Sequence, residues 1–292
     1  MPWLQLIINS SRQSAETIED ALLDSGAVSV TFEDNADQPI LEPALGETPL
    51  WQQTRITGLF DAGISTERVT HQLTEQLDGQ LPDYRWSPLE DRDWEREWMQ
   101  HYQPIRCGKR LWICPSWLAP PEPSSINMLL DPGLAFGTGT HPTTFLCLQW
   151  LDGIELAGKT VTDYGCGSGI LAIAALLLGA DSANCIDIDH QALLATTDNA
   201  QRNKLAPEKV LTYLPEQAPP IATDLVIANI LAGPLVSLAP KLNALTLPGG
   251  ALCLSGIIDT QADEVMSAYA PWFDFAPPAS REQWVRLTAT KR

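Results

Sequence analysis

Strand-like and helix-like segments alternate from residue 160 to the end of the sequence. Short apolar runs predict strands, and segments whose apolar residues recur every three or four positions predict helices. The strands are predicted at 160–164, 183–188, 210–214, 224–228, 251–255 and 284–290, and the helices at 170–178, 191–203, 234–245 and 261–269. A chain with this alternation folds into an open, mostly parallel, doubly wound α/β sheet with helices on both faces. Such sheets bind ligands at the carboxyl ends of their strands, so a binding site is expected there.

The first 92 residues follow another pattern. Strands are predicted at 3–8, 28–32, 51–60 and 84–89, and helices at 14–23 and 65–79. The order β-α-β-β-α-β is typical of a ferredoxin-like α+β unit. A chain of 292 residues is also longer than the ~100–200 residues usual for one domain. We therefore expect a separate ferredoxin-like domain over 1–92 that serves substrate recognition or docking, because it carries no catalytic motif.

Residues 93–125 predict a linker between the two domains. A charged helical stretch places Trp94 and Trp98 four residues apart, and the run A-P-P-E-P-S-S follows at 119–125. Proline fixes φ and removes a backbone donor, which makes the second half stiff. The tryptophans are expected to pack the two domains together. The catalytic domain is then predicted over 126–292.

The net charge limits the possible partners. The chain has 36 acidic and 18 basic side chains, a net charge of −18. Residues 1–95 hold 18 of the acids and 5 of the bases, a net charge of −13. Nucleic-acid binders normally carry a basic patch, and this surface repels phosphate. Direct nucleic-acid binding and an anionic membrane are therefore not expected, and a basic protein or a small cation is the favoured partner.

Cysteine usage and the N-terminus predict a cytoplasmic protein with reduced thiols. The six cysteines form no C-x-x-C pair, and residues 1–5 lack the features of a signal peptide. The longest apolar run, 169–180, is shorter than the ~20 residues of a membrane span. The four histidines show no ligand spacing, so no metal site is predicted.

A glycine-rich turn follows the first strand of the predicted sheet. The segment V-T-D-Y-G-C-G-S-G contains Asp163, Gly165, Gly167 and Gly169. A dinucleotide fingerprint needs glycine at relative positions 1, 3 and 6, but position 6 is Ile170. An acid two residues before the first glycine suits a cationic ligand, whereas a pyrophosphate favours an electropositive helix start. S-adenosylmethionine, which carries an ammonium and a sulfonium, has the required charge.

A second acid, Asp187, ends the next predicted strand, 22 residues after Gly165. A carboxylate at this position can accept both ribose hydroxyl hydrogens of an adenosine. Alone, either feature could be an ordinary glycine turn or a strand-end acid. Together, at this spacing, they predict a nucleoside site.

The fourth strand of the sheet ends at Asn229, in L-V-I-A-N-I-L-A. This side chain could simply cap the next helix. In N-methyltransferases, however, an Asn or Asp at the matching position, followed by Pro-Pro and an aromatic residue, receives the N–H groups of the nitrogen to be methylated. Here Ile230, Leu231 and Ala232 replace that tail. Without an aromatic ring to stack on a flat base or amide, the pattern favours an aliphatic amine.

The segment D-P-G-L-A-F-G-T-G-T-H-P-T-T at 131–144 precedes the cofactor strand. It contains three glycines, and Pro142 suits the first turn of a helix that opens near His141. It could be an interdomain loop with a helix cap. Its position also makes it a candidate lid over the methyl donor.

These four segments together resemble the bacterial PrmA family, the methyltransferases of protein eleven of the large ribosomal subunit. The resemblance covers essentially the whole chain, and the 131–144 loop is its most specific part. It implies a class I S-adenosylmethionine-dependent protein N-methyltransferase acting on the N-terminal α-amine and lysine ε-amines of that basic ribosomal protein. It also implies that the N-terminal domain grips the substrate while the linker lets the catalytic domain reach several amines. Thr162, Tyr164 and His190 depart from the usual residues of the motifs without removing a contacting group.

The resemblance implies cofactor contacts at Thr144, Gly165, Asp187 and Asn229, and the glycine motif adds Asp163 and Gly167. Asn229 is the predicted catalytic residue, orienting the neutral amine, with proton loss to solvent. We expect a monomer.

Two other functions remain open at this point. The first is a class I methyltransferase acting on RNA or on a glutamine amide of another translation protein; the missing Pro-Pro-aromatic tail and the net charge argue against it. The second is a non-catalytic module with a retained nucleoside pocket, which the complete set of motif residues argues against.

Overall fold

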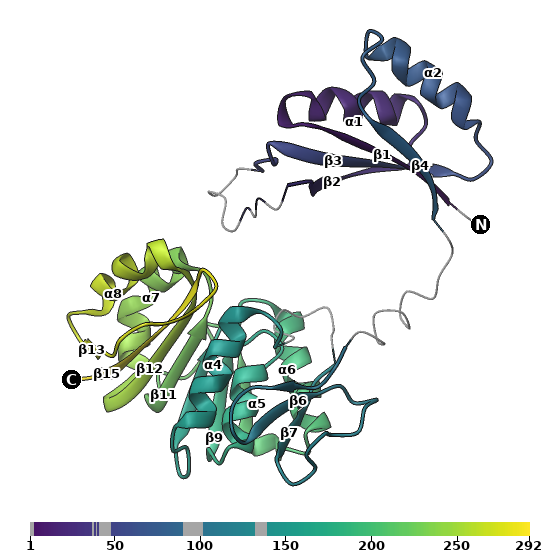
Figure 1. Cartoon of the computed structure of the whole chain (residues 1–292). Coiled ribbons are helices and arrows are strands. Elements are labelled where there is room, and N and C mark those ends of the chain that lie inside the picture. The colour runs from purple at the N-terminus through teal and green to yellow at the C-terminus, as the bar shows by residue number, and fades with distance from the viewer. Residues whose placement is uncertain (1–2, 37, 39, 41–47, 90–101, 132–138) are drawn as a thin grey trace. The chain divides into compact units, whose positions relative to one another are not determined.

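The computed structural model describes residues 3–36, 38, 40, 48–89, 102–131 and 139–292. The chain forms two compact units, Met1–Met99 and Gln100–Arg292 (Figure 1). The predicted helical stretch with Trp94 and Trp98 lies outside the described residues.

The first unit has the predicted β-α-β-β-α-β order. Its elements are β1 (Trp3–Ser11), α1 (Ala15–Asp24), β2 (Ser29–Asp34), β3 (Gln53–Asp61), α2 (Thr66–Gln76) and β4 (Tyr84–Leu89). The strands form an antiparallel sheet in the order β2-β3-β1-β4, and the helices lie on one of its faces (Figure 1). Alternate residues of β1 and β3, such as Leu6, Ile8 and Ile56, are buried beneath Leu22 and Leu73 of the helices. This confirms the ferredoxin-like prediction.

The second unit contains the predicted doubly wound sheet. Its strands are β8 (Thr160–Tyr164), β9 (Ser182–Ile186), β10 (Val210–Tyr213), β11 (Thr223–Asn229), β12 (Thr246–Ile258), β13 (Phe273–Phe275), β14 (Ala279–Arg281) and β15 (Trp284–Lys291). The sheet order is β10-β9-β8-β11-β12-β15-β13, and β14 pairs with β15. The strands from β10 to β12 are parallel, and β15 is antiparallel to β12. The short strands β13 and β14 were not predicted.

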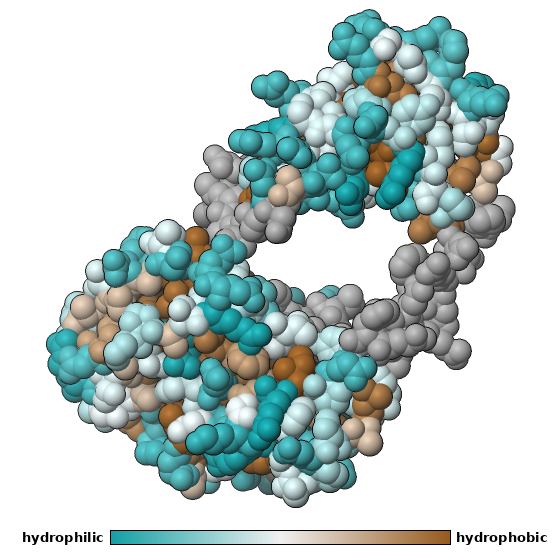
Figure 2. Space-filling model, viewed as in Figure 1, coloured by the Kyte–Doolittle hydropathy of each residue, from teal (hydrophilic) through white to brown (hydrophobic). Residues whose placement is uncertain are grey.

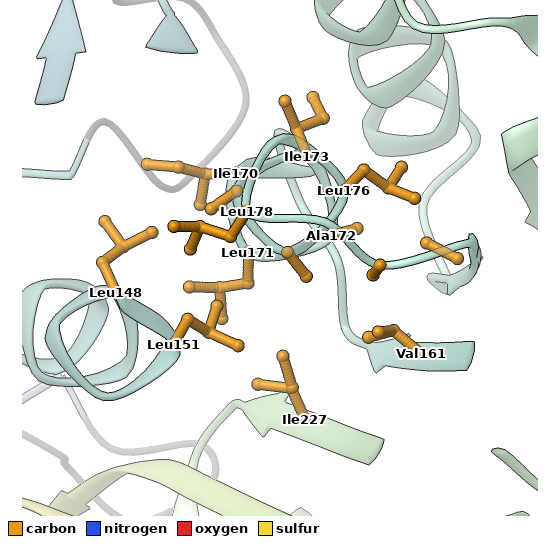
Figure 3. Close-up of a cluster of buried hydrophobic side chains, with 14 of the residues drawn as sticks. Leu148, Leu151, Val161, Ile170, Leu171, Ala172, Ile173, Leu176, Leu178 and Ile227 are labelled. Carbon is orange, nitrogen blue, oxygen red and sulfur yellow. The ribbon is translucent and has the colours of Figure 1, made fainter. Parts of the chain in front are cut away.

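Helices cover both faces of this sheet. They are α4 (Pro142–Gly153), α5 (Ile170–Leu177), α6 (His190–Arg202), α7 (Ala232–Leu245) and α8 (Ala262–Tyr269). Ile227 of β11 lies in the same apolar cluster as α4 and α5, whereas its neighbours Val226 and Ala228 pack with α7 and α8. Figure 3 shows Leu148 of α4 and Leu171 of α5 within the first cluster. Because α5 is apolar on all sides, burial fixes the helix and the turn that precedes it.

The predicted linker over 93–125 is wrong for its second half. Strands β5 (Ile105–Arg106), β6 (Leu111–Cys114) and β7 (Ile126–Leu129) form a three-stranded sheet within the second unit. Leu111 and Ile113 are buried in the same cluster as α5. These strands are too short to show a clear alternation of apolar and polar residues, and the neighbouring prolines favoured a linker instead.

Side chains of two helices attach this small sheet to the rest of the unit. Asn203, at the end of α6, donates from Nδ2 to the Leu129 carbonyl (2.8 Å) and accepts from the Leu129 N–H (2.7 Å). The buried carboxylate of Asp152 in α4 accepts the backbone N–H of Lys109 (2.5 Å) and of Arg110 (3.0 Å). These contacts tie the region predicted as a linker to the catalytic sheet.

The six cysteines lie in the second unit, and all are free and buried. In Figure 2, hydrophilic side chains occupy most of the visible face of the first unit. Within the described ranges, no helix has the length and apolar character that a membrane crossing requires.

Candidate active site

The glycine-rich turn connects β8 to α5 at the carboxyl end of the sheet. Gly165, Gly167 and Gly169 have φ values of +79°, +55° and +77°, which side-chain-bearing residues rarely adopt. A Cβ at Gly165 would collide with Ile230, and a Cβ at Gly169 would lie 2.7 Å from Thr196 Cγ2. Both glycines therefore serve conformation and close packing. Within the turn, Gly165 and Gly167 are partly exposed, whereas Gly169 is buried.

Helix α6 holds this turn in place. The hydroxyl of Thr196 donates to the Gly167 carbonyl (3.0 Å), and Asn199 Nδ2 donates to the Ser168 carbonyl (2.9 Å). Sequence reasoning missed both residues. Their signal was two polar side chains three positions apart on the apolar face of the predicted helix.

Asp187 follows β9 and meets the glycine turn. Its Oδ2 accepts the Gly167 N–H at 2.9 Å, and its Oδ1 accepts the Asp189 N–H at 3.0 Å. These bonds hold the carboxylate, which is only partly buried, in one orientation. The next residue, Ile188, is 85% exposed. An apolar side chain so exposed beside a fixed carboxylate is available to pack against a flat ring.

Asp163 lies beneath the turn, with 0% of its surface exposed. One carboxyl oxygen accepts the Ala172 N–H of α5 at 3.1 Å, and the other has no hydrogen-bond partner in the described part of the chain. Burial raises the pKa of Asp163 to about 7; the Ala172 hydrogen bond opposes this rise and the Asp187 charge adds to it. The side chain that was expected to face the ligand is thus enclosed by protein.

Asn229 and Thr144 come together from distant parts of the sequence. Asn229, the last residue of β11, donates from Nδ2 to Thr144 Oγ1 at 3.2 Å. Thr144 is fully buried in the first turn of α4. This bond leaves the amide oxygen of Asn229 as the acceptor for an incoming N–H group.

The start of α4 confirms the predicted helix opening near His141. His141 Nδ1 accepts the Thr143 N–H at 3.4 Å, and Pro142 occupies the first helical position. The ring of His141 also contacts Trp284 of β15, with centroids 4.8 Å apart. Burial lowers the pKa of His141, and the nearby Glu282 opposes this effect. Both effects act on a ring whose Nδ1 caps the helix at Thr143, the residue before Thr144.

The segment after Asn229 packs tightly against β12. Gly256 has a φ of +83°, and a Cβ there would lie 2.7 Å from the carbonyl carbon of Ile230. The buried Ser255 donates to the Val285 carbonyl at 3.0 Å. Strand β12 thus supports the backbone that follows Asn229.

Most of the predicted lid, residues 132–138, lies outside the described residues. Asp131, which precedes it, accepts the Ser116 N–H (2.7 Å) and hydroxyl (2.8 Å) and lies 3.6 Å from Arg202 Nε. The beginning of the lid segment is therefore fixed on the second unit.

The site fits a nucleoside that carries positive charge. The glycine turn lies at the carboxyl end of the sheet, and Asp187, bonded to the Gly167 N–H, presents a fixed carboxylate beside it. The buried Asp163 adds an oxygen with no partner in the described structure. These three features match the recognition of a ribose and a cationic chain.

Comparisons with known proteins agree with this geometry. The family model described as "Ribosomal protein L11 methyltransferase (PrmA)" matches residues 2–292. The ribosomal protein L11 methyltransferase of Cellvibrio japonicus is 61% identical over 291 residues, covering 100% of this chain and 99% of the relative. That of Teredinibacter turnerae is 58% identical over 292 residues, covering 100% and 98%.

A solved structure, that of the ribosomal protein L11 methylase from Lactobacillus delbrueckii subsp. bulgaricus, is also similar. It has a TM-score of 0.59 and 31% sequence identity, and covers 65% of this chain and 98% of its own. The chain therefore belongs to the ribosomal protein L11 methyltransferase (PrmA) family, class I methyltransferases whose methyl donor is S-adenosylmethionine.

Proposed function

We propose that this protein methylates the N-terminal α-amine and lysine ε-amines of ribosomal protein L11. The observation that carries the proposal is the Asn229–Thr144 bond. This bond engages the amide NH2 group of Asn229, so the amide oxygen can accept an N–H group of the amine to be methylated. The residues that follow are Ile230 and Leu231, and Leu231 is 50% exposed. An aliphatic wall beside a hydrogen-bond acceptor suits an aliphatic amine better than a base or an amide.

The acceptor amine must be neutral to attack. With ordinary pKa values near 7.7–8.0 and 10.4, deprotonation at pH 7 costs about 1 kcal/mol for an α-amine and about 4.6 kcal/mol for lysine. The α-amine is therefore the easier acceptor. Lysine needs a site that lowers its pKa by removing it from water.

When bound, S-adenosylmethionine would supply an electrophilic methyl group, whose carbon the amine nitrogen attacks in line while the carbon–sulfur bond breaks and S-adenosylhomocysteine leaves. The protein contributes alignment. Asp187 and the Gly167 backbone fix the nucleoside end, and Asn229 Oδ1 accepts an N–H of the amine so that its lone pair faces the methyl group. The proton of the amine passes to solvent.

The first unit is proposed to bind the protein substrate, and the part of the predicted 93–125 linker that precedes the second unit is proposed to let the catalytic unit reach several amines. The proposal includes action in the cytoplasm as a monomer on a basic ribosomal protein, without direct nucleic-acid contact. The charge of residues 1–95 supports this partner, because an acidic surface attracts basic proteins and repels RNA.

The test incubates this protein and radiolabelled S-adenosylmethionine with each of three substrates. These are purified L11 that lacks methylation, an undermodified ribosomal extract, and RNA from that extract. We expect label in one small basic protein, and mass spectrometry should place methyl groups on its N-terminal amine and on lysine side chains. L11 with an acetylated N-terminus should lose methylation of the N-terminal amine and keep methylation of its lysine side chains. Label in RNA or on glutamine would contradict the proposal.

A further inference from the structure

Asp163 lies where the methyl donor has to pass. Strand β8 is between β9 and β11 in the sheet. Asp187 follows β9, and Asn229 ends β11. A donor whose ribose binds Asp187 and whose methyl group faces Asn229 therefore crosses the carboxyl end of β8, where Asp163 lies two residues before Gly165. This route rests on the donor placement proposed above.

The surroundings of Asp163 do not compensate a negative charge. Cys185 of β9 and Ile227 of β11 are its register partners, and Ala172 of α5 gives it one hydrogen bond. The hydrogen bond with Cys166, together with burial, raises the pKa of Cys185, and burial together with the hydrogen bond to Cys147 raises the pKa of Cys253 in β12, so both thiols stay neutral.

The remaining charged neighbour is Asp187, a second acid. Among the groups that act on Asp163 in the described part of the chain there is no cation. A carboxyl group that is buried without a cation and keeps one oxygen unpaired is stabilised in its neutral form.

We propose that binding of S-adenosylmethionine displaces the proton of Asp163, and that this exchange distinguishes the methyl donor from its demethylated product. The donor and the product share an ammonium and a carboxylate, but only the donor carries the sulfonium charge. Asp163 loses its proton to the buffer when the cation binds. After methyl transfer the positive charge is gone, the carboxyl group takes a proton back, and the site loses part of its attraction for the product.

The size of the effect follows from the protonation of the free enzyme. Since the pKa of Asp163 is about 7, roughly half of the sites hold the proton at pH 7. Donor binding should then release on the order of half a proton per site. Between pH 6 and pH 8, donor affinity should rise by up to about tenfold, and product affinity by less.

Isothermal titration of the full-length protein with each ligand, without protein substrate, tests this. Titrations at pH 7 in two buffers of different ionisation enthalpy give the number of protons released. We expect release with S-adenosylmethionine, a smaller release with S-adenosylhomocysteine, and none with the donor in Asp163→Asn, which keeps an acceptor for the Ala172 N–H. Because L11 is absent, failure here leaves its methylation untouched.

The matched control is Asp181→Asn, which removes an exposed carboxylate at the opposite end of β9 and should release protons as the wild type does. Infrared difference spectra of the wild type provide a readout that does not need a variant, because the carbonyl band of a buried carboxylic acid should disappear when the donor binds. Equal release with both ligands, no buffer dependence, or full release in a folded Asp163→Asn protein would overturn the proposal.

Discussion

Asn229 is the residue proposed to orient the acceptor amine through its amide oxygen. Replacing it by alanine should lower kcat by about 10²-fold, the usual effect of removing one preorganised polar contact at a reacting centre. The Kd for S-adenosylmethionine should change by only a few fold, because Asp187 and the glycine turn still hold the nucleoside. Stopped-time methylation assays together with titration of the donor measure both quantities. Wild-type turnover in Asn229→Ala would show that the amide has no such role.

Thr144 sets the orientation of that amide. Thr144→Val keeps the shape of the side chain but removes the oxygen that accepts from Asn229 Nδ2. We expect a loss in kcat that Thr144→Ser restores, with little change in donor Kd. If valine and serine behave alike, the hydrogen bond does not matter for the reaction.

Asp187 is the proposed partner of the ribose hydroxyls. Loss of hydrogen bonds to a charged acceptor costs about 1.5–3 kcal/mol, so Asp187→Ala should weaken donor binding by about 10- to 100-fold. Equilibrium dialysis with labelled donor measures this. A Kd equal to that of the wild type would remove the ribose assignment.

The buried carboxyl of Asp163 makes stability depend on pH. In the unfolded chain its pKa has the ordinary value of about 3.9, and in the folded protein it is about 7. Between these values the folded state holds a proton that the unfolded state lacks, so this group lowers the free energy of unfolding as pH rises from about 4 to about 7.

Asp163→Asn does not have this pH-dependent loss. Relative to the wild type, its free energy of unfolding should therefore be higher at pH 8 than at pH 5, by an amount on the order of 2–4 kcal/mol. Urea titrations of both proteins without ligand at pH 5 and pH 8 give the free energy of unfolding of each. The variant-minus-wild-type difference at pH 8 is then compared with the one at pH 5. The same variant-to-wild-type difference at pH 5 and pH 8 would mean that the carboxyl is ionised throughout.

Gly169, in the turn between β8 and α5, needs to be glycine for two reasons, its positive φ and its close contact with Thr196. Gly158, which precedes β8, shares only the first reason and therefore serves as the matched control. Gly158 and Gly169 have nearly equal φ values of +74° and +77°, but an added Cβ meets nothing at Gly158 and would clash with Thr196 at Gly169. Both alanine variants should lose stability from the backbone strain. Gly169→Ala should lose about 1–3 kcal/mol more from overpacking and should also bind the donor more weakly. Equal losses in chemical denaturation would show that Thr196 adjusts without cost.

The regular elements of both units could be predicted because their patterns repeat over several turns or residues. Helix α5 is an uninterrupted apolar run, and the middle parts of β1 and β3 alternate buried and partly buried positions. Strands β5, β13 and β14 have only two or three residues, so no period can emerge, and they exist because neighbouring strands pair with them. The same holds for the attachment of β7 by Asn203, which depends on a residue 74 positions away.

The sequence predicted which residues of the candidate site would lie near one another. Asp187 and Gly167 are bonded because the carboxyl ends of neighbouring parallel strands meet at one edge, whereas Asn229 at the end of β11 is bonded to Thr144 in the first turn of α4. The inward direction of Asp163 was not predictable, since a strand residue near a turn can face either way. The positions of Thr196 and Asn199 on the apolar face of α6 were a signal in the sequence, but their hydrogen bonds to the turn depend on tertiary packing of α6.

The charge of the first unit has a testable use. Its exposed acids include several on the outer faces of α1 and α2, namely Glu16, Asp20, Asp24, Glu67 and Glu75. Neutralising them to the corresponding amides should lower kcat/KM for L11 several-fold at low salt and weaken its dependence on ionic strength, because attraction to a basic substrate is lost.

The comparison for this variant is an equal number of neutralised acids on the second unit, at Asp181, Glu208, Glu216, Asp259 and Asp263. This control should change kcat/KM for L11 less, and neither set should alter donor Kd. If both sets have the same effect, the charge of the first unit serves solubility only.

The distribution of the thiols makes the catalytic unit observable on its own. All six cysteines are buried in residues 100–292, and the sequence of the first unit contains none. A thiol-specific reagent can therefore label the chain only when the second unit opens, whatever the first unit does. Cys166 lies within the glycine turn and Cys114 in the small sheet, so mass spectrometry of the labelled peptides would rank the local opening of these two regions. If the methyl donor protects Cys166 from the reagent, this protection reports donor binding without an engineered reporter residue.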